Sequence, residues 1–217
     1  MVPFTKLTGV AASLPQDDVD TDQVLPTPWL RDPKADLAKG LFGYLRRAPA
    51  GKTESDFVLE QPPFRRTRIL VCGSNFGCGS SREHAVWAIK AFGIRCLIAP
   101  SFADVFRENC LRNGVLAIRL PAEQMEALHA AVQSVAGASP FVVDLEERRI
   151  VYPDGRSVTF DISDHEREAL LLGLDDIGLT ERHLSEIERW ESTSRDSLPF
   201  LQDFRIAPFD PSNKPSQ

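Results

Sequence analysis

The chain has 217 residues, of which 42% are hydrophobic and 26% are charged, and its 25 basic and 31 acidic side chains give a formal net charge of −6. This composition is typical of a globular protein, and an acidic chain lacks the basic character of most nucleic-acid-binding proteins. No apolar run approaches the roughly 18 residues of a membrane-spanning helix, and residues 1–6 lack a signal-peptide pattern. We therefore expect a cytoplasmic protein with no nucleic-acid or membrane partner.

Strands and helices alternate through the middle of the chain. The apolar run at 68–72 predicts a buried strand, and a glycine-rich loop follows at 73–79. The segment Ser80-Ser81-Arg82-Glu83 matches a capping box and predicts a helix from Ser80 to about residue 92. Further strands are predicted at 94–99 and 115–120, and further helices at 101–112 and 122–135. This alternation predicts a parallel sheet with right-handed crossovers.

The second half of the chain predicts a hairpin and two more helices. Strands are expected at 141–145, 150–152 and 157–162, the last two joined by a turn, and helices at 164–172 and 180–190, the second opened by a cap at Thr180. We predict one domain over residues 1–193. The polar segment 32–53 is expected to be a mobile loop, and the proline-rich residues 194–217 an irregular or disordered tail.

Four cysteines stand at positions 72, 78, 96 and 110, and no two of them form a CxxC pair. That spacing argues against a structural zinc site or a redox motif. We expect Cys72, Cys96 and Cys110 to be small buried core residues and Cys78 to be a loop residue with no metal role. Free thiols suit a reducing cytoplasm.

The glycine-rich loop and the predicted helix after it favour an anion, because backbone N–H groups gather there. A phosphate-binding loop of the Walker type would need a lysine before Ser80, and a dinucleotide loop would need a glycine where Arg82 stands. An arginine clasps a carboxylate with two parallel hydrogen bonds, and a serine at a helix tip is placed to form an alkoxide. The residues alone leave open the simpler interpretation of a helix cap and a surface arginine.

Three segments resemble the swivelling domain of the aconitase superfamily. They are residues 77–85 (GCGSSREHA), residues 18–26 (DVDTDQVLP) and residues 99–106 (APSFADVF). The chain length and residues 173–180 (GLDDIGLT) are similar to those of the isopropylmalate dehydratase small-subunit family. The resemblance implies an α/β fold, a three-layer β/β/α swivelling domain with a parallel or mixed sheet.

The resemblance also implies roles for individual residues. Ser80 would be the base that removes a proton from carbon, Ser81 would hydrogen-bond a substrate oxygen, and Arg82 would bind a substrate carboxylate. Asp22 would line the site and orient an arginine, although a turn aspartate that caps its own backbone is the alternative. Arg31 lies where relatives carry a second substrate arginine. For His84, at the first turn of the predicted helix, we expect a structural role.

The family interconverts 2-isopropylmalate and 3-isopropylmalate through 2-isopropylmaleate, a hydro-lyase reaction of leucine biosynthesis. The resemblance therefore implies a partner large subunit, in a heterodimer or heterotetramer, that holds a [4Fe-4S] cluster. This chain is expected to bind no cofactor and to be inactive alone. Two alternatives stay open: a hydratase subunit for another small diacid, such as homoaconitate or a methylated maleate, and a non-catalytic anion-binding module.

Overall fold

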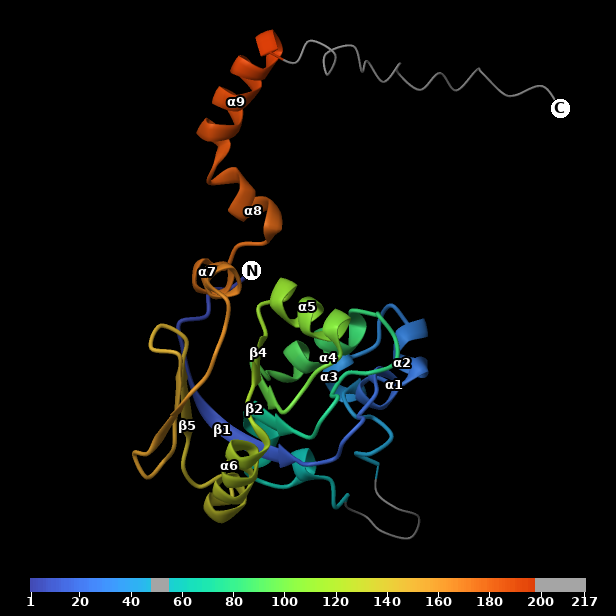
Figure 1. Cartoon of the computed structure of the whole chain (residues 1–217). Coiled ribbons are helices and arrows are strands. Elements are labelled where there is room, and N and C mark those ends of the chain that lie inside the picture. The colour runs from blue at the N-terminus through green and yellow to red at the C-terminus, as the bar shows by residue number, and fades with distance from the viewer. Residues whose placement is uncertain (48–54, 198–217) are drawn as a thin grey trace, which may run out of the picture. The chain divides into compact units, whose positions relative to one another are not determined.

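The computed structural model describes residues 1–47 and 55–197 and forms two units, Met1–Asp175 and Asp176–Gln217 (Figure 1). The first unit contains one seven-stranded mixed sheet in the order β4-β3-β2-β1-β5-β6-β7. The strands are β1 (Lys6–Leu14), β2 (Thr67–Cys72), β3 (Cys96–Ala99), β4 (Leu116–Arg119), β5 (Phe141–Asp144), β6 (Arg149–Val151) and β7 (Ser157–Thr159). Strands β1 to β4 pair in parallel, and β5 to β7 continue the sheet in antiparallel fashion from β1.

The helices of the first unit lie mostly between the parallel strands in sequence. They are α1 (Thr21–Val24), α2 (Thr27–Arg31), α3 (Leu37–Gly40), the 3-10 turns η1 (Val58–Glu60) and η2 (Phe64–Arg66), α4 (His84–Phe92), α5 (Asp104–Arg112), α6 (Ala122–Val135) and α7 (Asp164–Leu172). The second unit contains α8 (Asp176–Glu181) and α9 (Leu184–Ser197). Within the described ranges, no helix is both long enough and apolar enough to cross a bilayer.

Strand β1 divides the sheet into two halves, and sequence reasoning missed it. Residues 6–9 pair antiparallel with β5, whereas residues 10–14 pair in parallel with β2, and the register shifts between Val10 and Ala11. Such an irregularity bends a strand and increases its twist. One strand can therefore serve a parallel half and an antiparallel half that turns away from it.

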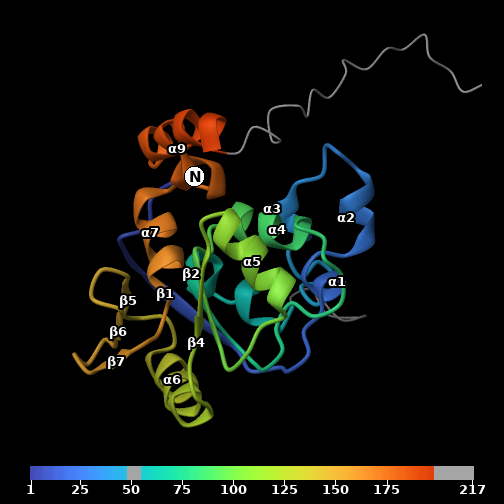
Figure 2. The same ribbon diagram turned by 45° about the horizontal axis from the view of Figure 1, so that its top comes forward.

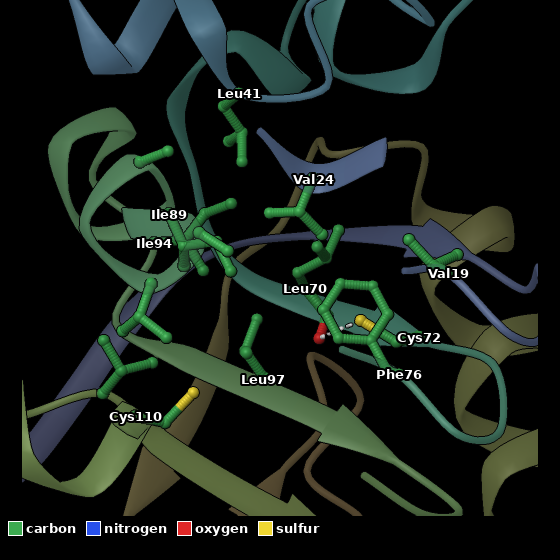
Figure 3. Packing of buried hydrophobic residues seen from close by; sticks show 14 of the residues in the cluster. Val19, Val24, Leu41, Leu70, Cys72, Phe76, Ile89, Ile94, Leu97 and Cys110 are labelled. Carbon is green, nitrogen blue, oxygen red and sulfur yellow. Dashed lines mark hydrogen bonds between the residues drawn. The ribbon is translucent and has the colours of Figure 1, made fainter. Parts of the chain in front are cut away.

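Alternating side chains of the parallel strands enter two different cores. On β2, Leu70 and Cys72 belong to a core shared with α4 and α5, whereas Ile69 and Val71 belong to a second core shared with β5, β6 and α6. Figure 2 shows α4 and α5 on one side of the parallel strands and the antiparallel strands, with α6, on the other, and Figure 3 shows the packing of the first core. The period of two in a strand thus separates the two cores, which agrees with the predicted β/β/α arrangement.

The predicted helix at 80–92 begins at His84, so its N-cap is Glu83 and not Ser80, and the capping box does not form. The Ser80 hydroxyl contacts Thr21 and Arg82 instead of the first turn of a helix. The Glu83 carboxylate accepts a hydrogen bond from the Asn113 side chain of α5. Both groups of the sequence motif are therefore used in tertiary contacts, and the prediction of Ser80 as a helix cap was wrong.

The predicted helix at 180–190 is two helices, because α8 ends at Glu181 and α9 begins at Leu184. Thr180 lies inside α8, where its hydroxyl donates to the Asp176 carbonyl, so it is not an N-cap. Of the segment predicted to be a mobile loop, residues 32–47 contain α3 and turns, and residues 48–53 lie outside the described residues. Of the predicted tail, residues 194–197 end α9, and residues 198–217 lie outside the described residues.

Two features exclude a side chain at Gly77, its backbone conformation and its packing. Its φ is +79°, and a Cβ there would lie 2.1 Å from the Phe106 ring. A positive φ costs about 1–2 kcal/mol for an L-residue, and overpacking a core costs about 1–3 kcal/mol more. We expect Gly77→Ala to lower the free energy of unfolding of the chain by roughly the sum of the two, measured by urea denaturation.

Gly155 provides the control, because its φ is +87° and a Cβ there would meet nothing within 4 Å. Gly155→Ala should carry only the backbone strain of about 1–2 kcal/mol. Equal losses for the two variants would contradict the proposed packing of Gly77 against Phe106.

Candidate functional site

The glycine-rich loop after β2 is held along one side by the segment that follows β1. The Ser74 amide donates to the Asp17 carboxylate at 2.6 Å, the Asp18 amide to the Ser74 carbonyl at 2.9 Å, and the Gly77 amide to the Val19 carbonyl at 2.8 Å. Because β1 and β2 are parallel, their carboxyl ends meet at one sheet edge, which is where open α/β sheets bind ligands. Two of the three segments that resemble the aconitase superfamily are thereby brought together.

The third of these segments, after β3, holds the other side of the loop. The Phe76 amide donates to the Ser101 carbonyl, and the Ala103 amide donates to the Phe76 carbonyl, each at 3.1 Å. The buried Phe76 ring packs edge-on against Phe102 and Phe106, with centroid distances of 6.5 and 5.6 Å. The loop is therefore fixed from both flanks by backbone hydrogen bonds and from below by aromatic packing.

Four side chains form a hydrogen-bonded chain at the end of this loop. Arg82 Nε donates to Ser80 Oγ at 2.8 Å, and Arg82 Nη2 donates to Asp22 Oδ1 at 2.6 Å. Ser80 Oγ also lies 2.8 Å from Thr21 Oγ1, which accepts from the Ser80 amide at 3.1 Å. The predicted residues Ser80, Arg82 and Asp22 are thus in direct contact, although Asp22 is 60 positions away from Arg82.

The arginine of this chain of contacts keeps donors free. The Arg82 side chain is 43% exposed and that of Asp22 is 59% exposed, while Ser80 is half-buried. A guanidinium carries five N–H donors, and Arg82 uses one on Ser80 and one on Asp22. The edge formed by Nη1 and the second Nη2 proton has no partner among the described residues. This edge has the geometry to hold a carboxylate with two parallel hydrogen bonds.

Three other residues with predicted roles, Ser81, His84 and Arg31, lie outside this chain of side-chain hydrogen bonds. Ser81 is exposed, and its carbonyl accepts from the Asn109 side chain at 3.2 Å. His84 opens α4, and its ring lies 4.4 Å from that of Trp87, with Nδ1 buried and unpaired among the described atoms. Arg31 is exposed at the end of α2 and forms no hydrogen bond or ion pair with a described residue. The structure does not join Arg31 to Ser80 or Arg82.

The cysteines offer little for metal chemistry. All four are free, and Cys72, Cys96 and Cys110 are buried, as predicted. Burial raises the pKa of these three thiols. Desolvation, and then the nearby Asp20 carboxylate, raise the pKa of the Cys78 thiol, which favours its neutral form. In residues 1–47 and 55–197, no group of three or more histidine, cysteine or acidic residues is arranged to hold a metal ion.

Sequence reasoning assigned no role to Thr21, which is 4% exposed and contacts both the amide and the hydroxyl of Ser80. The available signal was its place between Asp20 and Asp22 in the segment shared with the aconitase superfamily. Asn109 was also missed, because α5 otherwise reads as an amphipathic helix. Its side chain is buried and holds the backbone at Ser81.

Comparison with known proteins agrees with this geometry. Residues 1–123 match the aconitase C-terminal domain family. A 3-isopropylmalate dehydratase small subunit of Rhodospirillum centenum is 50% identical over 92% of this chain and 98% of its own length. One from Paramagnetospirillum magneticum is 49% identical over 93% of this chain and 100% of its own. The chain belongs to the 3-isopropylmalate dehydratase small-subunit family.

A solved member supports the fold of this small-subunit family for the chain. The crystal structure of a 3-isopropylmalate dehydratase from Methanocaldococcus jannaschii is 28% identical, with a TM-score of 0.61, and the match covers 85% of this chain and 99% of the other. The aconitase-type α/β fold expected from the sequence is thereby confirmed. The roles of individual site residues stay predictions.

The Asp22–Arg82 pair should matter little for folding of the isolated chain. Both side chains are largely exposed, and exposed ion pairs contribute about 0–1 kcal/mol. We expect Asp22→Asn to change the free energy of unfolding by less than about 1 kcal/mol, measured by urea denaturation at neutral pH.

The matched comparison is Glu166→Gln, which weakens a two-pronged pair with Arg107 whose side chains are only 19% and 24% exposed. Hydrogen bonding by Arg107 holds the pKa of Glu166 below its usual range. The Arg107–Glu166 pair therefore contributes its full stability above the ordinary glutamate pKa near 4.5. This contribution is lost as the pH falls through the lowered pKa of Glu166 in the folded state. A larger loss for Asp22→Asn than for Glu166→Gln would show that the site pair is structural.

Proposed function

We propose that this chain acts as the small subunit of a 3-isopropylmalate dehydratase, a hydro-lyase that interconverts 2-isopropylmalate and 3-isopropylmalate through 2-isopropylmaleate. The observation that carries the proposal is the Ser80 hydroxyl held at 2.8 Å from Arg82 Nε, in a chain 50% identical to a protein of that name. The names of the relatives favour this function over a hydratase for another diacid and over a non-catalytic anion-binding module.

Arg82 is proposed to bind a carboxylate of the substrate. Asp22 and Ser80 occupy one edge of its guanidinium and fix the plane of the group. The other edge is free to clasp a carboxylate with two parallel hydrogen bonds, which a lysine cannot reproduce. With one carboxylate held by Arg82, the substrate carbon is proposed to come within reach of Ser80 Oγ, as proton abstraction requires.

Ser80 is proposed to be the base. Its alkoxide takes a proton from the substrate carbon, the C–H electron pair forms the double bond, and the hydroxyl departs from the neighbouring carbon with the C–O electron pair. In the readdition, the hydroxyl binds to the carbon that lost the proton, and the proton on Ser80 goes to the carbon that lost the hydroxyl. The helix dipole acts only within the first turn, and α4 begins at His84, so it contributes little at Ser80. The adjacent guanidinium of Arg82 carries the stabilisation instead.

The remaining assignments rest on family resemblance. Ser81 is proposed to hydrogen-bond a substrate oxygen, and Arg31 to bind the second carboxylate from α2. We also propose that the catalytic module spans residues 1–193. A [4Fe-4S] cluster on a partner large subunit is proposed to supply a Lewis acid for the departing hydroxyl. The described residues of this chain do not form a ligand set for such a cluster.

Reconstitution tests the function directly. The purified chain should carry no stoichiometric iron and should not isomerise 2-isopropylmalate, whereas its complex with a cluster-bearing large subunit should do so. Iron content, absorption of the cluster and formation of 3-isopropylmalate are the measurements. A complex that hydrates homoaconitate or methylated maleates but not isopropylmaleate would contradict the substrate assignment. Iron–sulfur absorption from the isolated chain would contradict the assignment of the cluster to the large subunit.

Ser80→Ala and Arg82→Lys separate the two proposed roles in the reconstituted enzyme. Ser80→Ala should lower kcat by about 10² to 10⁴-fold, the usual contribution of an acid–base group, with little change in KM because the hydroxyl acts in the transition state. Arg82→Lys keeps the charge and loses the two-pronged geometry, so KM should rise and kcat should fall.

The unfolding midpoint of each variant serves as the control for folding, and its co-purification with the large subunit serves as the control for assembly. Ser80→Ala loses hydrogen bonds at a cost of about 1 kcal/mol and should still assemble. Near-normal turnover by an assembled Ser80→Ala complex would make the assignment of the base wrong.

A further inference from the structure

Thr21 is a buried side chain whose hydroxyl faces the proposed base. It is the first residue of α1 and is 4% exposed. Its Oγ1 lies 2.8 Å from Ser80 Oγ and accepts a hydrogen bond from the Ser80 amide at 3.1 Å. The mechanism above does not use this residue, although it touches Ser80 twice.

The protons around Ser80 Oγ can be assigned by elimination. Arg82 Nε and the Ser80 amide are N–H groups and only donate, so Arg82 donates to Ser80 Oγ and the amide donates to Thr21 Oγ1. When Ser80 is an alkoxide it has no proton, so the bond between the two hydroxyls has one direction, from Thr21 to Ser80. The alkoxide then has Arg82 Nε and the Thr21 hydroxyl as close donors, each at 2.8 Å, and the Arg82 backbone amide as a third donor at 3.5 Å.

The hydrogen bond from the Ser80 amide to Thr21 strengthens the hydrogen bond from Thr21 to the Ser80 alkoxide. Because Thr21 Oγ1 accepts from the Ser80 amide, its own O–H becomes a stronger donor. The amide can reach Thr21 because Gly79, the residue before Ser80, has a φ of +94°. The backbone of Ser80 thus helps to stabilise a charge on its own side chain, through Thr21.

Thr21 is held in place independently of Ser80. Its amide donates to the Cys78 carbonyl at 2.9 Å. The preceding residue, Asp20, caps α1 by accepting from the Gln23 amide at 2.7 Å, and the Gln23 side chain accepts from the Asp20 amide in return. The donor is therefore oriented before a substrate arrives, which is the condition under which such donors stabilise a developing charge.

We propose that Thr21 is a positioning residue that orients the Ser80 hydroxyl and donates a hydrogen bond to its alkoxide. This inference rests on the proposed role of Ser80 as the base. Thr21 and Arg82 together fix the orientation of Ser80 Oγ, which then takes the proton from the substrate carbon. The proton taken from carbon ends on Ser80 Oγ, and Thr21 keeps its own proton throughout.

Three substitutions test the proposal in the reconstituted enzyme. Thr21→Val has the same shape without the hydroxyl and should lower kcat by about 10²-fold, as removal of one preorganised donor does, with KM little changed. Thr21→Ser keeps the hydroxyl and should stay close to the wild-type kcat. Thr67→Val is the matched control, because Thr67 is also buried and its hydroxyl donates to the Phe64 carbonyl outside the site. It should leave kcat unchanged.

Pairing these variants with Ser80→Ala separates positioning from general damage. If Thr21 acts through Ser80, Thr21→Val should lower the residual activity of Ser80→Ala no further. In the isolated chain, the urea midpoints of Thr21→Val and Ser80→Ala should be non-additive in the double variant, because both single changes remove the same hydrogen bond. This second measurement needs no activity and holds whatever the substrate is.

The possible failures are distinguishable. Wild-type turnover by Thr21→Val, or equal loss by Thr21→Ser and Thr21→Val, would overturn the role of Thr21 while leaving an inactive Ser80→Ala complex in agreement with the proposed base. A multiplicative loss in the double variant would assign Thr21 a role separate from Ser80. Additive midpoints in the isolated chain would contradict the hydrogen bond itself. Absence of isopropylmalate turnover by the wild-type complex would overturn the proposed function alone.

Discussion

The parallel pairing of β1 with β2 is the constraint on which the rest of the site depends. Leu14 at the end of β1 lies opposite Cys72 at the end of β2, so both chains leave the sheet at the same edge. The segments that follow continue to pair, and the isolated bridge between Asp20 and Cys78 is the last step of that pairing. Thr21 directly follows Asp20, Ser80 follows Cys78 after Gly79, and the two side chains meet. A shift of this register by one residue would turn every following side chain to the opposite face and separate the two hydroxyls.

Sequence patterns predicted the parts of this site that depend on local chemistry. The buried strand at 68–72, the glycine loop and the helices α6 and α7 follow from hydrophobic periodicity and from residues that favour turns, and the structure contains all of them. Strand β1 was missed because Ser13, Gly9 and Thr8 interrupt its apolar pattern. Its role is fixed by partners on both sides, and such long-range pairing leaves a weak local signal.

The error at Ser80 has a related cause. The letters of Ser80-Ser81-Arg82-Glu83 satisfy a local rule for a helix start, yet the groups of the motif are used elsewhere, by Thr21 on one side and by Asn113 on the other. Local rules are most often overridden where side chains have a second use. The late start of α4 frees the Ser80 hydroxyl from capping, and the resemblance to the aconitase superfamily identified the same segment as functional before its backbone was known.

Exposure of the arginine explains why such a site would be divided between two chains. In water, two unit charges 4 Å apart interact by about 1 kcal/mol, whereas the same pair near a protein surface of lower effective dielectric gains about 4 kcal/mol. Arg82 is 43% exposed and Asp22 is 59% exposed in the isolated chain, so the guanidinium stabilises an alkoxide at Ser80 only weakly there. A second protein surface that covered Arg82 and Asp22 would remove water and strengthen the hydrogen bonds to Ser80. On this argument the chain holds the proposed base, Ser80, preorganised but hydrated, and assembly with the proposed large subunit would place the same contacts in a less polar environment that strengthens them.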